Sequence, residues 1–344
     1  MRPLLRGRGE RNRKPDMQKP DMRVDFAGIR LRNPVIAASG TFGYGSEFAD
    51  IVSLNRIGGF VTKGLSAKPM AGNRAPRLIE TPAGMINAIG LQNVGVQAFV
   101  EKKLPLLRSY AETACIANVF GYQVADYVAV VEALNAAPGI AAYELNVSCP
   151  NTQHGGVVFG ADSGILNHLI TRVKAVAARP LWVKLSPNVT SIADMARCAA
   201  DAGADAISLV NTFVALAIDC ETRRPRIANV TGGLSGPAIK PIALRMVYEV
   251  SRAVSIPVCG MGGIACAADA VEFLLAGAKA VQVGTASYAD PRAVEKIARS
   301  LERWCARHQV SRVTELSGGM LIPEIERPTD KPADQKPVTV EAGK

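Results

Sequence analysis

Residues 142–151, AYELNVSCPN, place a thiol, a hydroxyl and two amides within the six positions 146–151. The apolar first half is typical of a β-strand, and Cys149-Pro150-Asn151 ends it because proline cannot donate a hydrogen bond within a sheet. At such a strand exit, a nucleophile or proton acceptor lies beside groups that hydrogen-bond a polar ligand. A single cysteine before a turn is more often a small buried residue, so the interpretation depends on the rest of the chain.

Lysines and asparagines end several other apolar runs. Lys63 follows GGFVT, and Lys184 follows LWV. If both lysines meet at one pocket, they suit an anion or a group that gains negative charge during a reaction; the alternative is that each reaches solvent. Asn118, Asn146 and Asn211 stand at three strand ends, a recurrence that turn formation does not require. Amides at that level suit a planar heterocycle with amide-like edges.

Glycine-rich segments follow the last two apolar runs, GMGGIA at 260–265 and GTA at 284–286. The first fits the G-x-G-x-x-[GA] pattern of dinucleotide sites, but no acidic residue stands about 20 positions downstream, which argues against that interpretation. In a barrel such loops hold phosphate through backbone amides, and GGLSGP at 232–237 adds a similar stretch. With the lysines and asparagines, these loops predict a flavin mononucleotide beside a small polar substrate.

Strands and helices are expected to alternate along most of the chain. Short runs rich in β-branched residues alternate with amphipathic stretches, the pattern of parallel strands joined by helices. The expected strands are 34–38, 59–62, 116–119, 142–147, 181–185, 206–210, 257–259 and 280–283. The expected helices are 126–137, 164–178, 192–202, 239–254, 267–276 and 291–308, with Gly203 and Gly277 at C-terminal caps. Eight strands predict an α/β fold, a TIM (β/α)8 barrel with its site at the carboxyl ends of the strands; an open doubly wound sheet is the alternative.

Charge and composition divide the chain into three regions. Residues 1–22 carry seven Lys/Arg against three acidic residues, which predicts a basic disordered extension rather than a nucleic-acid-binding arm. Residues 23–317 are expected to form an FMN-binding barrel domain, with a small hairpin at 24–31 plugging its bottom and inserted loops at its C-terminal face. Residues 318–344, with spaced prolines, are expected to form a flexible tail.

Overall composition bounds the class of protein. The 344 residues are 48% hydrophobic and 20% charged, enough to bury a full core. No run approaches about 18 consecutive apolar residues, and the start lacks an apolar secretory core, so a cytoplasmic protein without membrane contact is expected. Seven cysteines include no C-x-x-C pair, so neither a metal site nor an iron–sulfur cluster is expected on this chain.

Seven motifs within 24–317 resemble the class 1 dihydroorotate dehydrogenases of pyrimidine synthesis, most closely the catalytic subunit of the NAD-linked (type B) enzymes. The motifs are ASGTFGYG, NAIGLQNVGV, ELNVSCPNTQHGG, VKLSPNVT, TGGLSGPAIKP, GMGGI and VGTA. The resemblance implies oxidation of (S)-dihydroorotate to orotate, with Cys149 as the base that removes the C5 proton while the C6 hydride passes to FMN. Residues 152–160 are then expected to form a lid that excludes water, with His154 as an ordinary loop residue on it.

The resemblance also implies the ligand contacts. The FMN contacts would be Ser39, Lys63, Gly64, Asn118, Asn146, Lys184, Val210, Gly236, Gly262, Gly263, Gly284 and Thr285. The substrate contacts would be Lys63, Asn87, Ala88, Ile89, Gly90, Leu91, Asn146, Asn211 and Thr212. Lys184 would stabilise charge on the reduced flavin, and Lys63 would face the orotate carboxylate or bridge to the flavin.

A reduced flavin must pass its electrons on, yet the sequence shows no nicotinamide site and no cluster ligands. For type B enzymes the resemblance implies a homodimer that binds an electron-transfer subunit carrying FAD and a [2Fe–2S] cluster, which reduces NAD⁺; the whole is a heterotetramer. Discrimination from fumarate-linked type A enzymes rests on Ile89 and Gln92. Further alternatives are a dihydropyrimidine dehydrogenase-like flavoenzyme, a flavin-free barrel that isomerises a sugar phosphate, and a non-enzymatic barrel scaffold.

Overall fold

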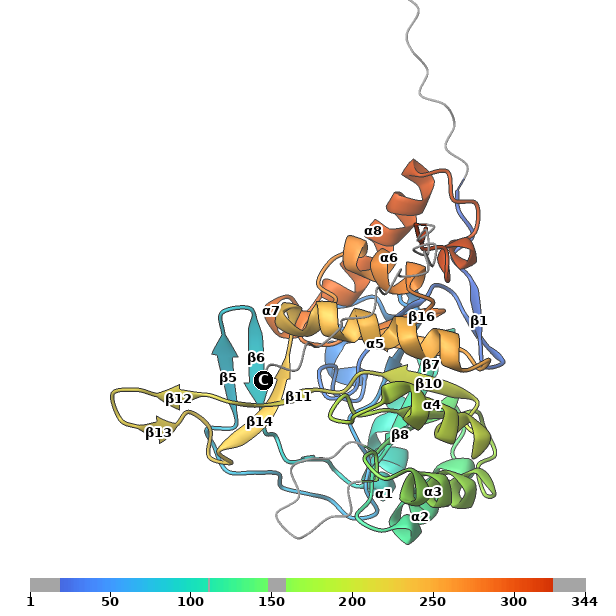
Figure 1. Ribbon diagram of the computed structural model, residues 1–344. Helices are drawn as coiled ribbons and strands as arrows, with labels where there is room; N and C mark the ends of the chain where they lie inside the picture. The colour runs from blue at the N-terminus through green and yellow to red at the C-terminus, as the bar shows by residue number, and fades with distance from the viewer. Residues whose placement is uncertain (1–18, 111, 148–158, 324–344) are drawn as a thin grey trace, which may run out of the picture.

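The computed structural model describes residues 19–110, 112–147 and 159–323, and its centre is a closed barrel of eight parallel strands (Figure 1). In chain order the barrel strands are β3 (Val35–Ala37), β4 (Gly59–Val61), β7 (Ala114–Val119), β8 (Ala142–Asn146), β9 (Leu181–Lys184), β10 (Ala206–Leu209), β15 (Val258–Met261) and β16 (Ala280–Val283). The last strand pairs with the first, with Gln282 opposite Ile36. This closure confirms the predicted TIM barrel, and the open sheet is wrong.

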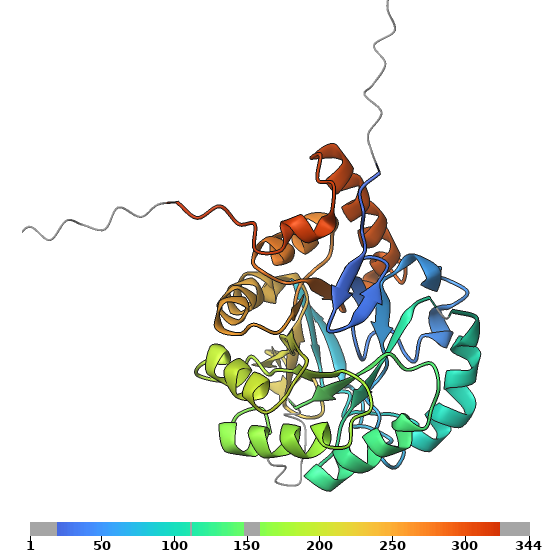
Figure 2. The same cartoon turned by 90° about the vertical axis from the view of Figure 1, so that its right-hand side faces the viewer.

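Helices form a ring around the outside of the barrel (Figure 2). The main ones are α2 (Val124–Asn135), α3 (Ser163–Lys174), α4 (Ile192–Asp201), α5 (Lys240–Ala253), α6 (Ala267–Leu275) and α8 (Ala293–Arg307). All six were predicted, and their ends differ from the prediction by a few residues. Each buries one apolar stripe, as α8 does with Val294, Ile297 and Leu301, because residues three and four apart share a helix face.

Local signals in the sequence set several helix ends. The Ser191 hydroxyl accepts a hydrogen bond from the Asp194 amide at 3.2 Å and caps the start of α4. Gly203 and Gly277, with φ of 99° and 113°, follow the ends of α4 and α6 in the left-handed region that favours glycine. These two glycines confirm the predicted C-terminal caps.

A helical segment between β4 and β7 was not predicted from the sequence. It consists of α1 (Val96–Ala98), η3 (Phe99–Lys103) and η4 (Leu104–Tyr110), which are α, π and 3-10 in hydrogen-bonding pattern. Pro105 lacks an amide donor, which disfavours one regular α-helix through this stretch. The remaining short helices are η1 (Ser46–Phe48), η2 (Leu54–Arg56), η5 (Pro237–Ile239), α7 (Ala286–Ala289) and η6 (Val313–Leu316).

A second, antiparallel sheet stands beside the barrel (Figure 1). Its order is β11 (Phe213–Leu216), β14 (Thr231–Ser235), β6 (Gly84–Asn87) and β5 (Leu78–Thr81), and a separate pair, β12 (Ile218–Asp219) and β13 (Arg224–Pro225), lies between β11 and β14 in the chain. The insertions predicted as loops at the C-terminal face therefore contain strands. The glycines of β14 hide this strand in the sequence, because glycine occurs both in flexible loops and where packing is too close for a side chain. Gly233 is of the second kind, since a Cβ at this position would lie 2.0 Å from Thr212 Oγ1.

The predicted hairpin at the start of the fold is present as β1 (Val24–Phe26) and β2 (Ile29–Leu31). Phe26 is fully buried, and its ring meets that of Trp182 edge-on, with centroids 4.8 Å apart. Trp182 lies two residues before Lys184 on β9, at the amino-terminal side of the barrel interior. The hairpin thus packs on the end of the barrel opposite the carboxyl ends of the strands.

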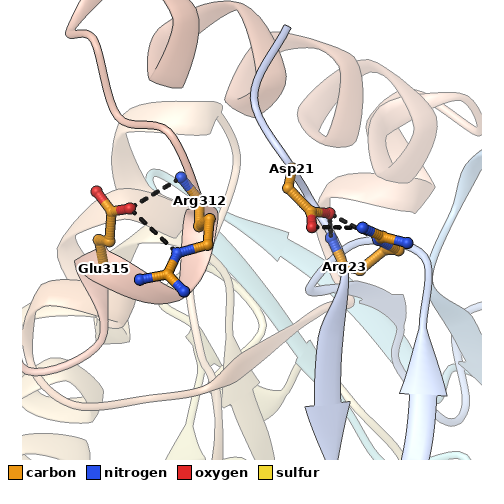
Figure 3. A network of polar contacts seen from close by, with 4 residues as sticks. All are labelled: Asp21, Arg23, Arg312 and Glu315. Atoms are coloured by element: carbon orange, nitrogen blue, oxygen red, sulfur yellow. Dashed lines mark hydrogen bonds and ion pairs between the residues drawn. The ribbon is translucent and has the colours of Figure 1, made fainter.

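The chain before the hairpin lies beside the segment before η6 (Figure 3). Asp21 and Arg312 form a parallel β-bridge. Arg23 donates hydrogen bonds to both carboxylate oxygens of Asp21, at 2.8 and 2.7 Å, and these bonds lower the pKa of Asp21 to about 2. Arg312 pairs with Glu315 beside them. Both ion pairs are largely exposed and add little stability, so the backbone bridge is the main connection.

Packed residues extend beyond both boundaries predicted for the barrel domain, 23 and 317. Asp21 lies before the first, and after the second the amides of Gly318 and Met320 donate to the carbonyls of Leu274 and Leu275 in α6. The rest of the predicted extension, 1–18, and of the tail, 324–344, lies outside the described residues. Within the described ranges, no helix is long and apolar enough to cross a bilayer. The cytoplasmic location stays a prediction.

Candidate active site

A pocket lies where the carboxyl ends of the barrel strands meet the second sheet. It gathers most of the residues predicted to bind ligands: Ser39, Lys63, Gly64, Asn87, Ile89, Gly90, Leu91, Asn118, Asn146, Lys184, Val210, Asn211, Thr212, Gly236, Gly262, Gly263, Gly284 and Thr285. They lie at or just after the ends of all eight barrel strands and of β6 and β14. Sites in TIM barrels form at this end, although the binding role of each residue stays a prediction.

Two predicted site residues fall outside this set. Ala88 is not among the lining residues: it packs, fully buried, with Ile86 and Ile227 in a small core under the second sheet, and its contact with substrate stays a prediction. Asn87 faces the pocket, and the next residue of an extended chain points to the opposite side. Cys149, the predicted base, lies outside the described residues, as does His154.

The pocket has further lining residues that were not named individually as ligand contacts from the sequence, although five of them lie in the quoted segments ASGTFGYG, GGLSGP and GMGGIA. These are Ala38, Gly40, Thr41, Met85, Ser235, Ile239, Met261, Gln282 and Tyr288. Gln282 could have been found, because it is the polar residue of the otherwise apolar strand β16, and a buried amide needs a partner. Met85 carries no such signal, since methionine in a strand is usually part of the core.

Three glycines shape the loops after β14 and β15. Gly236, Gly262 and Gly263 have φ of 95°, 125° and 81°, in the region that favours glycine. The two loops touch, because a Cβ on Gly263 would lie 2.8 Å from the Gly236 carbonyl oxygen and 2.8 Å from Lys240 Cβ. Side chains are therefore excluded at this wall of the pocket, which leaves the backbone close to any ligand, as in phosphate-binding loops.

An ion-paired aspartate holds the loop after β15. Asp269 Oδ2 accepts hydrogen bonds from the amides of Ala265 (2.8 Å) and Cys266 (2.9 Å), and Oδ1 accepts one from Lys240 Nζ (2.7 Å). Burial alone would raise the pKa of Asp269, but these hydrogen bonds outweigh it and hold the pKa below its usual value. Hydrogen bonds to Asp269 and Glu272 raise the pKa of Lys240. The loop is thereby anchored to the starts of α5 and α6.

Two lysines face the pocket, and neither forms an ion pair with any residue that the structure describes. Lys184, at the end of β9, is only 7% exposed. Lys63 follows β4, where burial and then the positive charge of Arg77 lower its pKa against an opposing effect of Glu47. Ammonium groups that are buried, as in Lys184, or half-buried, as in Lys63, and that have no ion-pair partner among the described residues favour the binding of an anion or of a group that gains negative charge.

Amide side chains gather on one side of the pocket. Asn211 Nδ2 lies 3.3 Å from Asn146 Oδ1, and the Thr212 amide donates to Asn211 Oδ1 at 2.8 Å. Asn87 Nδ2 donates a long hydrogen bond of 3.4 Å to the Gly233 carbonyl. These contacts hold the amides in place on strands and strand ends, where they can pair with the donors and acceptors of a polar ligand.

A buried polar layer lies beneath the pocket, centred on Glu144 of β8. Glu144 has no exposed surface and accepts hydrogen bonds from Asn118 Nδ2 (2.8 Å), Gln282 Nε2 (2.7 Å) and Ser208 Oγ (2.9 Å). The oxygens of both amides, Asn118 Oδ1 and Gln282 Oε1, are buried and have no partner among the described residues. An unsatisfied buried acceptor costs about 1–3 kcal/mol, so these two oxygens indicate a ligand that donates.

Comparison with known proteins agrees with this geometry. A sequence profile of the family described as dihydroorotate dehydrogenase matches residues 21–304. The catalytic subunit of dihydroorotate dehydrogenase B (NAD(+)) from Geobacter sulfurreducens is 57% identical over 306 residues, 89% of this chain and 100% of the relative. The corresponding subunit from Trichlorobacter lovleyi is 56% identical over 302 residues, 88% of this chain and 99% of the relative.

A third relative carries a different name. This protein of Solibacter usitatus, provisionally named dihydroorotate dehydrogenase A (fumarate), is 58% identical over 299 residues, 87% of this chain and 98% of the relative. The range that matches the family profile, 21–304, spans the barrel, the second sheet and the pocket. The chain therefore belongs to the dihydroorotate dehydrogenase family.

Proposed function

We propose that this chain oxidises (S)-dihydroorotate to orotate in pyrimidine synthesis. The observation that carries the proposal is the pocket that joins two lysines to a rim of amides, in a chain of this family. Dihydroorotate is a small ring with a carboxylate and amide-like edges, so it needs a cation and fixed donors and acceptors. Lys63, Asn87, Asn146 and Asn211 supply these groups.

The other pocket residues fit one FMN per chain. Positive-φ glycines in the loops after β14 and β15 expose the backbone that a phosphate requires. The oxygens of Asn118 and Gln282 have no partner in the part of the chain that the structure describes, and they fit a heterocycle that donates from N–H. The residues proposed to hold it are Ser39, Lys63, Gly64, Asn118, Asn146, Lys184, Val210, Gly236, Gly262, Gly263, Gly284 and Thr285. When bound, FMN supplies the acceptor for the C6 hydride of the substrate.

The resemblance of its motif to the family assigns proton removal to Cys149, which lies outside the described residues. A thiol takes the C5 proton only as a thiolate, so its surroundings must favour that form. Lys63 would pair with the substrate carboxylate, and that negative charge would offset the burial that lowers the lysine pKa. Lys184 would stabilise the negative charge that develops on the ring system beside it.

For the electrons we propose NAD⁺ as the final acceptor, reached through an electron-transfer subunit that carries FAD and a [2Fe–2S] cluster, on a homodimeric core within a heterotetramer. Support comes from the name catalytic subunit, which relatives such as that of Geobacter sulfurreducens bear. Fumarate is the second candidate, because the Solibacter usitatus relative is named for it. Of the two residues used for this distinction, Ile89 lines the pocket, whereas Gln92 accepts a hydrogen bond from Arg77 at 2.6 Å.

Orotate formation by the purified, FMN-loaded protein tests the proposal. Dihydroorotate would be supplied with fumarate alone, and with NAD⁺ in the presence and absence of a candidate electron-transfer subunit. We expect repeated turnover with NAD⁺ only when the subunit is present, and no more than one orotate per bound flavin with fumarate. Turnover with fumarate alone would assign the chain to the second candidate. No orotate with either acceptor or with an artificial dye would overturn the proposed activity.

A further inference from the structure

Glu144 is a buried acid for which the proposed reaction has no use. It lies in the middle of β8, has no exposed surface, and forms no ion pair within the described residues. A buried carboxylate without a cation is costly to keep, so it normally accepts hydrogen bonds from every side. Its three donors, on Asn118, Gln282 and Ser208, come from three other barrel strands, β7, β16 and β10.

Two of these donors are amides, and an amide has a donor end and an acceptor end. A carboxylate only accepts, so the NH2 groups of Asn118 and Gln282 must face Glu144, and their carbonyl oxygens must face away. Both side chains line the pocket, both are 1% exposed, and both oxygens lack a partner among the described residues. Turning either amide over would lose a hydrogen bond and set a carbonyl oxygen against the carboxylate.

Glycine leaves room at one of these oxygens. A Cβ on Gly64 would lie 3.1 Å from Asn118 Oδ1, and Gly64 itself lines the pocket. Ser208 differs from the two amides, because a hydroxyl can rotate and therefore fixes no orientation. The contacts of Glu144 thus fix how these two amides are oriented: Asn118 and Gln282 turn their acceptor ends, not their donor ends, toward the ligand.

We propose that Glu144 is a positioning residue that orients Asn118 and Gln282 so that their carbonyl oxygens face the bound flavin and share its ring N–H in a three-centre hydrogen bond. The inference rests on the proposed FMN site. An oxidised flavin ring has a single N–H, that of its imide, so the site selects rings that keep this hydrogen. Flavins in which a methyl group replaces it leave the two oxygens unsatisfied and bind more weakly.

The test compares the affinities of the apoprotein for FMN and for FMN methylated at the imide nitrogen, by quenching of flavin fluorescence. The wild-type protein is expected to prefer FMN at least tenfold. In Glu144→Gln, which keeps the shape but can donate, the amides can turn over, so the preference should fall at least threefold. Ser208→Ala is the matched control: it also removes a buried hydrogen bond to Glu144, and the preference should stay at the wild-type value.

The ratio of the affinities for FMN and for the methylated flavin distinguishes a role of Glu144 in orienting the amides from a role in stabilising the fold. If Glu144 only stabilises the fold, Glu144→Gln weakens both flavins equally and leaves the ratio unchanged, which overturns the inference. Equal binding of both flavins by the wild-type protein overturns it even if the variant does not fold. Failure of the wild-type protein to bind FMN at all removes the proposed cofactor site as well, so the two failures are distinguishable.

Discussion

Replacing Gly263 with alanine tests whether the loops after β14 and β15 form a close-packed wall for the cofactor. Gly263 has φ of 81°, where an alanine costs about 1–2 kcal/mol for its backbone alone. The new Cβ would also lie 2.8 Å from the Gly236 carbonyl oxygen and 3.0 Å from the Lys240 amide nitrogen. Neither neighbour is a side-chain end that can swing aside, so the loops must move, at about 1–3 kcal/mol. We expect unfolding free energy to fall by about 2–5 kcal/mol in total.

Gly28→Ala is the matched control. Gly28 has a similar φ of 78°, but apart from Gly28 itself and its two chain neighbours, no heavy atom of the described residues lies within 4 Å of the position its Cβ would take. It connects β1 to β2 in the hairpin, at the end of the barrel away from the pocket. The control therefore carries only the backbone cost, about 1–2 kcal/mol, and should bind FMN as the wild-type protein does.

Urea unfolding of the apoproteins gives the stabilities, and fluorescence titration gives the affinities for FMN. Displacement of the two loops should weaken FMN binding by Gly263→Ala about tenfold or more, which corresponds to about 1.4 kcal/mol. Equal losses of stability in the two variants, together with wild-type affinity for FMN in Gly263→Ala, would refute the reasoning that the two loops pack against each other to hold the cofactor.

Three further predictions concern charged and reactive groups. Cys149→Ala should keep the yellow flavin but lose most turnover at neutral pH in a steady-state assay, and full activity would remove Cys149 from the base role. Burial and the charge of Arg77 lower the pKa of Lys63, so the charged lysine destabilises the folded state. Lys63→Met should therefore raise the free energy of urea unfolding at neutral pH by about 1 kcal/mol. This gain in stability should vanish as the pH rises through the usual lysine pKa, because the lysine of the wild-type protein then loses its charge. A gain that persists above that pH would contradict the burial argument. The pKa of Asp269 is lowered, so the stability that this carboxylate adds to the fold is complete above the usual aspartate pKa and is lost as the pH falls. Asp269→Asn should therefore have a lower free energy of unfolding than the wild-type protein at neutral pH, and the difference should shrink in acid. Urea unfolding at several pH values measures this difference, and a difference that does not shrink in acid would contradict the prediction.

The barrel could be predicted because its strands carry strong local signals. Strands such as β9 and β16 are apolar, since both faces of a parallel strand are covered, and helices with one apolar stripe separate them. The second sheet could not be predicted in the same way. Its strand β14 has the sequence TGGLS, and the glycines at 232 and 233 indicate a loop unless the close neighbours that exclude a side chain are known.

Part of the site could be predicted because the barrel strands that carry it could be predicted. In a barrel, each strand ends at the same rim, so Lys63, Asn118 and Lys184 meet although they are far apart in sequence. The polar layer below that rim remained hidden, because Glu144 and Gln282 stand singly in apolar strands and acquire meaning only when closure brings β8 and β16 within hydrogen-bonding reach. Their partners are set by tertiary geometry, which local pattern does not contain.

Anaerobic mixing of the FMN-loaded protein with dihydroorotate is the most direct measurement of what this pocket does. With no acceptor and no partner present, the visible absorbance of oxidised flavin should disappear, and one orotate should form for each flavin bound. Bound flavin that keeps its absorbance in excess dihydroorotate, with no orotate in solution, would contradict the assignment of this pocket to dihydroorotate oxidation.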